Sequence, residues 1–238
     1  MAQSVSETFE FTFAGVATLD ARLSVGALSI EPGVDGQAHV VVTKRARHGF
    51  LGRDDITEDE LAEVVVTVEQ RGDRIVIDGP RRRNGRSLNN ISIEVTATVP
   101  RATNLDLRIS AGQASARGVA GRIAAQVDAG NFEAEEVTFA DGSQLTVNAG
   151  KVVASGALAE GASLAVDVNA GSVRLELPRT TAVNLDARAQ VGALDLVGWP
   201  VQVQRRFVEQ RASGPLAPNA KGELRVRMNA GSAAIVAR

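Results

Sequence analysis

Apolar and polar residues alternate along most of the chain with a period of two, and the alternation is organised around glycines. A ten-residue pattern such as LTVNAGKVVA, at 145–154, recurs seven times. Its central glycines are Gly26, Gly112, Gly130, Gly150, Gly171, Gly192 and Gly231. The four intervals from Gly112 to Gly192 are 18, 20, 21 and 21 residues. The chain therefore contains a repeat of about 20 residues, as in stacked repeat proteins.

The alternation changes phase at each glycine. Counted from the glycine, positions −7, −5, −3, −1, +2 and +4 are apolar in 41 of 42 cases, and Ser143 is the exception. Such alternation predicts strands with one buried face. The change of phase predicts a corner or bulge at the glycine, a residue that readily adopts positive φ. In this register Ala149 points inward and Thr146 outward, so Ala149→Leu is expected to overpack the corner and cost about 1–3 kcal/mol.

Stacking the copies turns each apolar position into a ladder with about 4.8 Å between strands. We therefore predict an all-β fold: a single-stranded β-solenoid of about seven rungs, with strand-rich insertions and at most one short helix. A right-handed coil is favoured, because crossovers between parallel strands normally have that hand. An antiparallel sandwich is the alternative, although it does not explain the near-constant spacing of the glycines.

The whole chain, 1–238, is predicted to form one domain. It divides into an N-terminal cap and first rung (1–30), a strand-rich excursion (31–100), regular rungs (101–197), an insertion (198–222) and a last rung (223–238).

Three stretches outside the regular rungs carry further predictions. FEFTF, at 9–13, is expected to close one end of the stack with its three rings. TEDELAEV, at 57–64, carries a capping-box pattern in Thr57 and Glu60 that predicts one short helix. The last repeat runs to Ile235, so the C-terminal rung is expected to be an exposed edge unless the 198–222 insertion folds over it.

Composition narrows the functional classes. Aromatic residues make up only 3% of the chain and glycines number 23, so the core is expected to consist of small aliphatic side chains. Cysteine is absent, which excludes disulfides and thiolate metal sites. The net charge of −2 does not indicate a polyanionic partner. The sequence has neither the features of a signal peptide nor an apolar stretch of transmembrane length, which predicts a cytoplasmic protein.

Candidate catalytic and metal-binding groups are few. His39 and His48 are the only histidines and make a weak metal site, so we expect neither a metal nor a cofactor. The outward acids Asp128 and Asp167 lie at different offsets in copies that are not adjacent, so the paired carboxylates of a β-helical polysaccharide enzyme are not evident. We therefore expect a non-enzymatic protein, and a carbohydrate-active enzyme is the least favoured alternative.

Two features are candidate binding surfaces. Position −2 is polar in every copy, and Asn148 and Asn169 are expected to stack on successive rungs. They are interpreted either as corner residues bonded to local backbone or as an outward ladder that binds ice, sugar or a partner edge. The second feature is a basic patch for an anionic partner, formed by Lys44, Arg45, Arg47, Arg81, Arg82, Arg83 and Arg86. The acidic run at 54–63 can neutralise it locally, and no aromatic residues interleave to stack bases.

Three segments resemble a bacterial family of β-strand-repeat proteins labelled "putative adhesin". They are VVTKRAR (41–47), VTVEQRGDRIVI (66–77) and VTATVPRATNLDLRISAGQASARGVAG (95–121). The likeness extends over roughly residues 15–197. It implies a β-solenoid and no known catalysis, and it supplies no functional residues.

These observations favour a scaffold that works by interaction with protein partners, including self-association through its terminal rungs into a homo-oligomer. The alternative is a binding module for an anionic surface, a membrane included, or for a regulatory partner. No specific nucleic-acid partner is expected.

Overall fold

The computed structural model describes residues 6–46, 58–82, 91–206 and 209–238. Within them sixteen strands form one sheet, accompanied by the short helix α1 (Glu58–Ala62). The strands are β1 (Ser6–Ala14), β2 (Thr18–Leu23), β3 (Ala27–Pro32), β4 (Gln37–Ala46), β5 (Val64–Arg71), β6 (Arg74–Arg82), β7 (Ile91–Val99), β8 (Asn104–Arg117), β9 (Ala120–Gly121), β10 (Ile123–Phe139), β11 (Ser143–Leu158), β12 (Ser163–Leu177), β13 (Val183–Val197), β14 (Gln204–Arg206), β15 (Glu209–Pro215) and β16 (Gly222–Ala237). The all-β prediction is confirmed.

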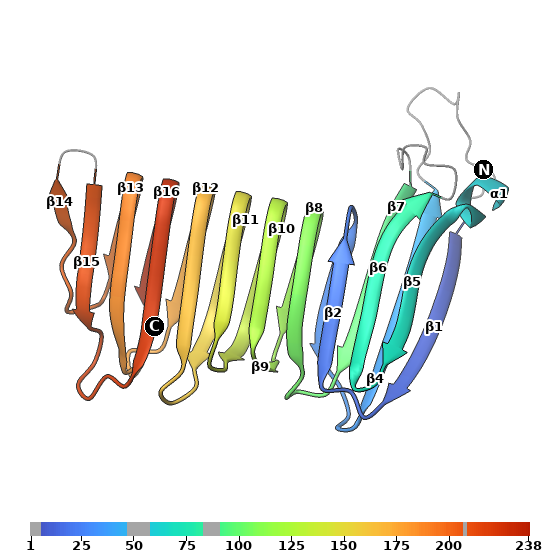
Figure 1. The fold of residues 1–238 in the computed structure, drawn as a ribbon, viewed down its shortest axis with the longest axis horizontal. Coiled ribbons are helices and arrows are strands. Elements are labelled where there is room, and N and C mark those ends of the chain that lie inside the picture. Colours follow the sequence, from blue (N-terminus) through green and yellow to red (C-terminus); the bar gives the residue numbers. More distant parts are fainter. Residues whose placement is uncertain (1–5, 47–57, 83–90, 207–208) are drawn as a thin grey trace.

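The long strands pair in parallel, with the glycines of neighbouring copies side by side. Gly112 aligns with Gly130, Gly130 with Gly150, and Gly150 with Gly171. An antiparallel sandwich is therefore wrong for this part of the chain. The sheet is open, because its order runs from β1 to β14 and these two strands do not pair with each other (Figure 1). A solenoid and its right-handed coil stay predictions.

The last copy does not end the stack. β16 lies between β12 and β13, with Gly231 opposite both Gly171 and Gly192, and Figure 1 marks the C-terminus beside it. Beyond β13 come β15 and β14, which pair antiparallel. The expectation that the C-terminal rung is an exposed edge is therefore wrong. The 24 residues 198–221 between β13 and β16 are long enough to let the chain pass β13 before it returns, and a longer loop adds little to the entropy of closure.

Each long strand bends at its glycine and continues beyond it. Gly130, Gly150 and Gly171 have φ values of 152°, 151° and 148°. We call the part before the glycine the first arm and the part after it the second arm. Positions −7, −5 and −3 on the first arms and +2 and +4 on the second arms are buried throughout, except for the half-buried Leu196. These five ladders form most of one hydrophobic cluster, so the predicted inward register is confirmed for them.

Position −1 does not follow this register. Ala111, Ala129, Ala149, Ala170 and Val191 are exposed, and Val25 and Ala230 are half-buried. The bend takes positions −1, 0 and +1 around the outside of the corner, so together with position −2 four successive residues face outward before alternation resumes. The inward placement of Ala149 is therefore wrong, and so is the overpacking expected from it.

The N-terminal excursion supplies the other end of the sheet. The predicted helix is present as α1, although Thr57 lies outside the described residues. β1 pairs with β4 at the end of the sheet, and its Phe11 and Phe13 pack against the core with ring centroids 6.3 Å apart. Phe9 stays 43% exposed. FEFTF therefore covers part of this end.

Candidate functional site

Lys44, the first residue of the expected basic patch, lies inside the protein. Its side chain is 7% exposed, and its ammonium Nζ lies 3.0 Å from the Glu7 carboxylate and 4.8 Å from the centroid of the Phe9 ring. Lys44 and Val42 both face inward on β4, whereas Arg45 is exposed, so the basic residues that begin at Lys44 do not lie on one face of the strand. This lysine is not available to an anionic surface.

The other described members of the patch each have an acidic partner. Arg45 pairs with Glu94 at 3.3 Å on β4 and β7, and Arg81 pairs with Asp78 at 3.5 Å on β6. Arg47, Arg83 and Arg86 lie outside the described residues, as does the side chain of Arg82. The patch as a whole therefore stays a prediction.

The asparagines at position −2 form a hydrogen-bonded ladder across four strands. Asn229 donates to Asn169 at 2.9 Å, Asn169 to Asn148 at 2.6 Å, and Asn148 to Asp128 at 2.7 Å. The expected stacking of Asn148 and Asn169 is confirmed. Their side chains bond to one another and not to local backbone, so the interpretation as corner residues is wrong. The ladder joins β10, β11, β12 and β16, and its binding to a partner stays a prediction.

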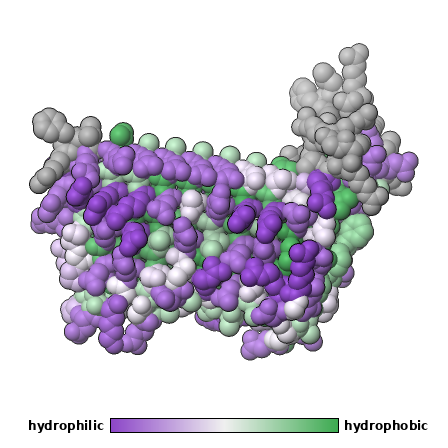
Figure 2. All heavy atoms as spheres, in the orientation of Figure 1, coloured by the Kyte–Doolittle hydropathy of each residue, from purple (hydrophilic) through white to green (hydrophobic). Residues whose placement is uncertain are grey.

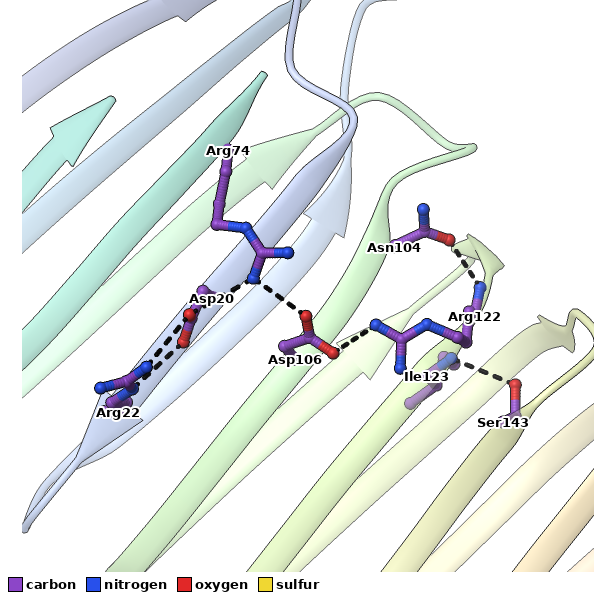
Figure 3. A network of polar contacts seen from close by, with 8 residues as sticks. All are labelled: Asp20, Arg22, Arg74, Asn104, Asp106, Arg122, Ile123 and Ser143. Atoms are coloured by element: carbon purple, nitrogen blue, oxygen red, sulfur yellow. Dashed lines mark hydrogen bonds and ion pairs between the residues drawn. The ribbon is translucent and has the colours of Figure 1, made fainter. Parts of the chain in front are cut away.

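A network of aspartates and arginines crosses the strands at the N-terminal half of the sheet (Figure 3). Arg74 on β6 lies 3.4 Å from Asp20 on β2 and 3.1 Å from Asp106 on β8. Asp106 also accepts from Arg122, which precedes β10. Sequence reasoning missed this network, although LDARL (19–23) and LDLRI (105–109) place an Asp and an Arg at the same offsets in two copies.

This network borders a hollow on the outer surface of the first arms, which we call the front face and which is the side seen in Figures 1 and 2. The hollow measures about 430 Å³. It is lined by Asp20, Arg22, Arg74, Asp106, Leu107, Arg108, Ala124, Ala125, Gln126, Gln144 and Thr146. A second hollow of about 400 Å³ adjoins it and shares Arg22, Arg108 and Gln126. The surface around both is largely hydrophilic (Figure 2).

One ion pair on the front face shifts the pKa of both of its members. At the far end of this face Arg227 on β16 donates to Asp186 on β13 at 2.7 Å. This hydrogen bond, opposed by partial burial and helped by the positive charges of Arg227 and Arg188, holds the pKa of Asp186 below its ordinary value. The same hydrogen bond, opposed by partial burial and helped by the negative charge of Asp186, raises the pKa of Arg227. Both groups are therefore charged at neutral pH.

The carboxylates do not form the pair that the enzyme alternative requires. Asp128 and Asp167 lie on β10 and β12 with β11 between them, so their strands are about 10 Å apart. Asp128 is engaged by the amides of Gln126 and Asn148. His39 lies 3.7 Å from Glu10, and His48 is outside the described residues. In the part of the chain that the structure describes, no group of three His, Cys, Asp or Glu residues is arranged to hold a metal ion, and no helix has the length and apolar character needed to cross a membrane.

Comparisons with known proteins give only distant likenesses. No protein-family model and no curated protein matches the chain. A solved structure named "putative cell adhesion protein" from Clostridium sporogenes is 16% identical, with a TM-score of 0.47 over 97% of this chain and 98% of that chain. A "putative adhesin" from Bacteroides fragilis is 11% identical, with a TM-score of 0.30 over 98% and 97%. A "putative lipid binding protein" from Parabacteroides distasonis is 12% identical, with a TM-score of 0.26 over 98% and 93%. At these TM-scores the likenesses assign neither family nor function, and the family noted from the sequence stays a resemblance.

Proposed function

We propose that the protein is a non-enzymatic scaffold, a right-handed β-solenoid that associates with a second copy through the N-terminal end of its stack. The observation that carries the proposal is the difference between the two ends of the sheet. One end finishes on a short, arginine-rich strand, whereas the other presents the longer edge strand β5, which begins with an uncharged apolar run.

The lengths of the connections support the solenoid. β10 has 17 residues and would be about 55 Å long if it were straight. Only residues 140–142 join its end to the start of its parallel neighbour β11, and such a link spans at most about 15 Å. β10 must therefore bend back on itself within one copy, which is the geometry of a coil. Its positive-φ residues Gly130 and Glu136 are positions for such bends.

Three features of the C-terminal end oppose further pairing, although Val191 and Val197 on β13 are exposed there. Its last strand, β14, has only three residues, two of them arginines. The side chain of Gln210 on β15 accepts from the Leu194 amide at 3.0 Å and donates to the Gly192 carbonyl at 2.9 Å, so it replaces a neighbouring strand along the second arm of β13. Trp199, Val201 and Val203 pack against the core beside it. Short, charged and covered edges are those that resist association.

Within the described residues, the two edge strands of the N-terminal end are longer than β14, with nine residues in β1 and eight in β5. Among the described residues β1 pairs only with β4, and β5 only with β6, so each has one unpaired edge. β5 begins VVVTV, five residues without charge, and the last four are only half-buried. Between the two strands lies a hollow of about 230 Å³, lined by Phe9, Phe11, Val42, Lys44, Ala62 and Val64–Val66. An apolar edge of this kind is a template for strand pairing.

A second copy fits this end better than a longer assembly does. A two-fold axis at Thr67 would pair β5 with β5 of the other copy in antiparallel fashion, with Thr67 opposite Thr67 and Val66 opposite Val68. Such Thr–Thr and aliphatic pairs stabilise antiparallel sheets, and no like charges are opposed. Because the C-terminal end is closed, association stops at a two-fold dimer and does not continue into a filament.

Sedimentation velocity of the full chain between about 1 and 100 µM tests the proposal. We expect a concentration-dependent dimer, and a monomer for Thr67→Lys, which places two lysines opposite each other at the axis. Thr96→Lys is the matched control, because Thr96 is exposed on the interior strand β7. Gln210→Ala is expected to open the second edge and produce species larger than dimers. A wild-type chain that stays monomeric at all concentrations, or a Thr67→Lys dimer as stable as that of wild type, would refute the proposal.

A further inference from the structure

Arg108 carries a charge that its neighbours do not neutralise. In the parallel register of β2 and β8 it lies directly opposite Arg22, so two exposed arginines occupy facing positions of neighbouring strands on the front face. Like charges opposite each other destabilise a sheet. Arg22 is paired with Asp20 at 3.4 Å, whereas Arg108 has no hydrogen-bond or ion-pair partner among the residues that the structure describes.

The surrounding carboxylates are already occupied. Asp20 is shared by Arg22 and Arg74, and Asp106 by Arg74 and Arg122. Around the two adjoining hollows five guanidinium groups therefore meet four carboxylates: Arg22, Arg74, Arg81, Arg108 and Arg122 against Asp20, Asp78, Asp106 and Asp128. This part of the front face carries a local positive charge in a protein whose net charge is −2.

The shape of the surface adds to this charge. Ala124 on β10 lies between Asp106 on β8 and Gln144 on β11 in one row of outward positions. Its small side chain leaves room between two longer ones, and Leu107 and Ala125 also line the depression. Arg108 borders this first hollow and the adjoining one, so its donors are accessible from both sides.

The remaining lining is polar and not aromatic. The amides of Gln126 and Gln144 and the hydroxyl of Thr146 provide both donors and acceptors. Such a lining suits a ligand with several hydroxyl groups, and it offers no ring to stack a base and little apolar surface for an acyl chain. A volume of about 430 Å³ is within the range of small-molecule sites.

We propose that the first hollow binds a hydroxylated carboxylate, that is, a sugar acid, with its carboxylate on Arg108 and its hydroxyls on Gln126, Gln144 and Thr146. The planar fork of a guanidinium matches a carboxylate in a bidentate pair, and the anion relieves the repulsion between Arg108 and Arg22. This binding site is independent of the dimer proposed above, because it uses the front face and not the N-terminal edge strands.

Calorimetric titration of the full chain with galacturonate, galactose and inorganic phosphate tests the assignment. We expect galacturonate to bind and galactose, which lacks the carboxylate, to bind at least tenfold more weakly. Arg108→Gln is expected to weaken galacturonate binding tenfold or more. Arg188→Gln is the matched control, because Arg188 has the same offset in the copy on β13 but is paired with Asp186.

A second variant separates the hollow from the charge alone. Ala124→Leu leaves every charge in place and fills the depression at an outward strand position, and it is expected to weaken galacturonate binding as well. Thermal melting confirms that each variant is folded. Three results would overturn the proposal: no galacturonate binding, phosphate binding as tight as galacturonate binding, or galacturonate binding unchanged in Arg108→Gln or in Ala124→Leu.

Discussion

Gly150→Ala tests the glycine corner most directly. Gly150 has φ of 151°, a conformation that residues with a Cβ rarely adopt, and the strain of such a backbone costs about 1–3 kcal/mol. A Cβ added there would also overlap the carbonyl oxygen of Gly130 on the next strand and approach its amide nitrogen to 3.0 Å. Because the obstacle is backbone, no rotamer relieves it, and moving the strand costs about 1–3 kcal/mol more.

Two variants separate these contributions. Gly161→Ala places a methyl at φ of 72° in a turn with nothing within 4 Å, so only the backbone strain of about 1–2 kcal/mol applies. Ala149→Leu changes an exposed side chain on the same corner and is expected to alter stability by no more than about 0.5 kcal/mol.

Thermal unfolding followed by circular dichroism at 218 nm distinguishes the three variants Gly150→Ala, Gly161→Ala and Ala149→Leu. For a chain of this size about 1 kcal/mol lowers the Tm by about 2–4 °C. A total of about 4 kcal/mol for Gly150→Ala therefore corresponds to about 8–16 °C, against about 2–8 °C for Gly161→Ala. A Gly150→Ala loss no larger than that of Gly161→Ala would show that the glycines do not stack closely. A large decrease in Tm for Ala149→Leu would indicate that position −1 is buried after all.

Three further predictions concern polar contacts. Asn169→Asp removes the amide donor to Asn148 and places a carboxylate against the side-chain carbonyl oxygen of Asn148. Urea unfolding at pH 7 is expected to show a loss of stability of about 1–2 kcal/mol, and a much smaller loss at pH 3.5, where the protonated carboxyl group can donate. The exposed Asn184→Asp is the control. Because the pKa of Asp186 is lowered by Arg227, its stabilising effect is complete above the unfolded pKa near 3.9 and is lost as pH falls through the lower folded pKa. The Tm deficit of Asp186→Asn is therefore expected at pH 7 and should shrink as the pH is lowered below about 3.9. A deficit independent of pH would contradict this. Lys44→Met leaves the Glu7 carboxylate unpaired and is expected to lower the free energy of unfolding by about 2 kcal/mol. Most of this loss is expected to be recovered when Lys44→Met is combined with Glu7→Gln, and a double-mutant cycle without coupling would exclude the internal ion pair.

The local pattern determined which side chains are buried on most of each copy. Alternation with period two is a property of any extended strand, so the ladders at −7, −5, −3, +2 and +4 followed from the sequence alone. The stacking of Asn148 on Asn169 followed as well, because equal offsets in adjacent copies become cross-strand neighbours. Position −1 did not follow, because the bend at the glycine leaves four successive residues, −2 to +1, facing outward, and the change of phase alone does not say which residues turn outward.

Only the tertiary structure decided which copies are neighbours. Every copy presents the same ladder of backbone groups and aliphatic side chains, so local pairing is nearly equivalent for any two of them, and nothing in the repeat places β16 between β12 and β13. Contacts between residues far apart in the sequence could not be predicted either. Glu7 pairs with Lys44 across 37 residues, and Gln210 bonds to the backbone of Gly192 and Leu194 from 18 and 16 residues away. The sequence determined the strands of each copy, because they depend on local alternation. The order of the copies in the sheet, the contacts of Gln210 with Gly192 and Leu194, and the unpaired Arg108 depend on which strands meet in space.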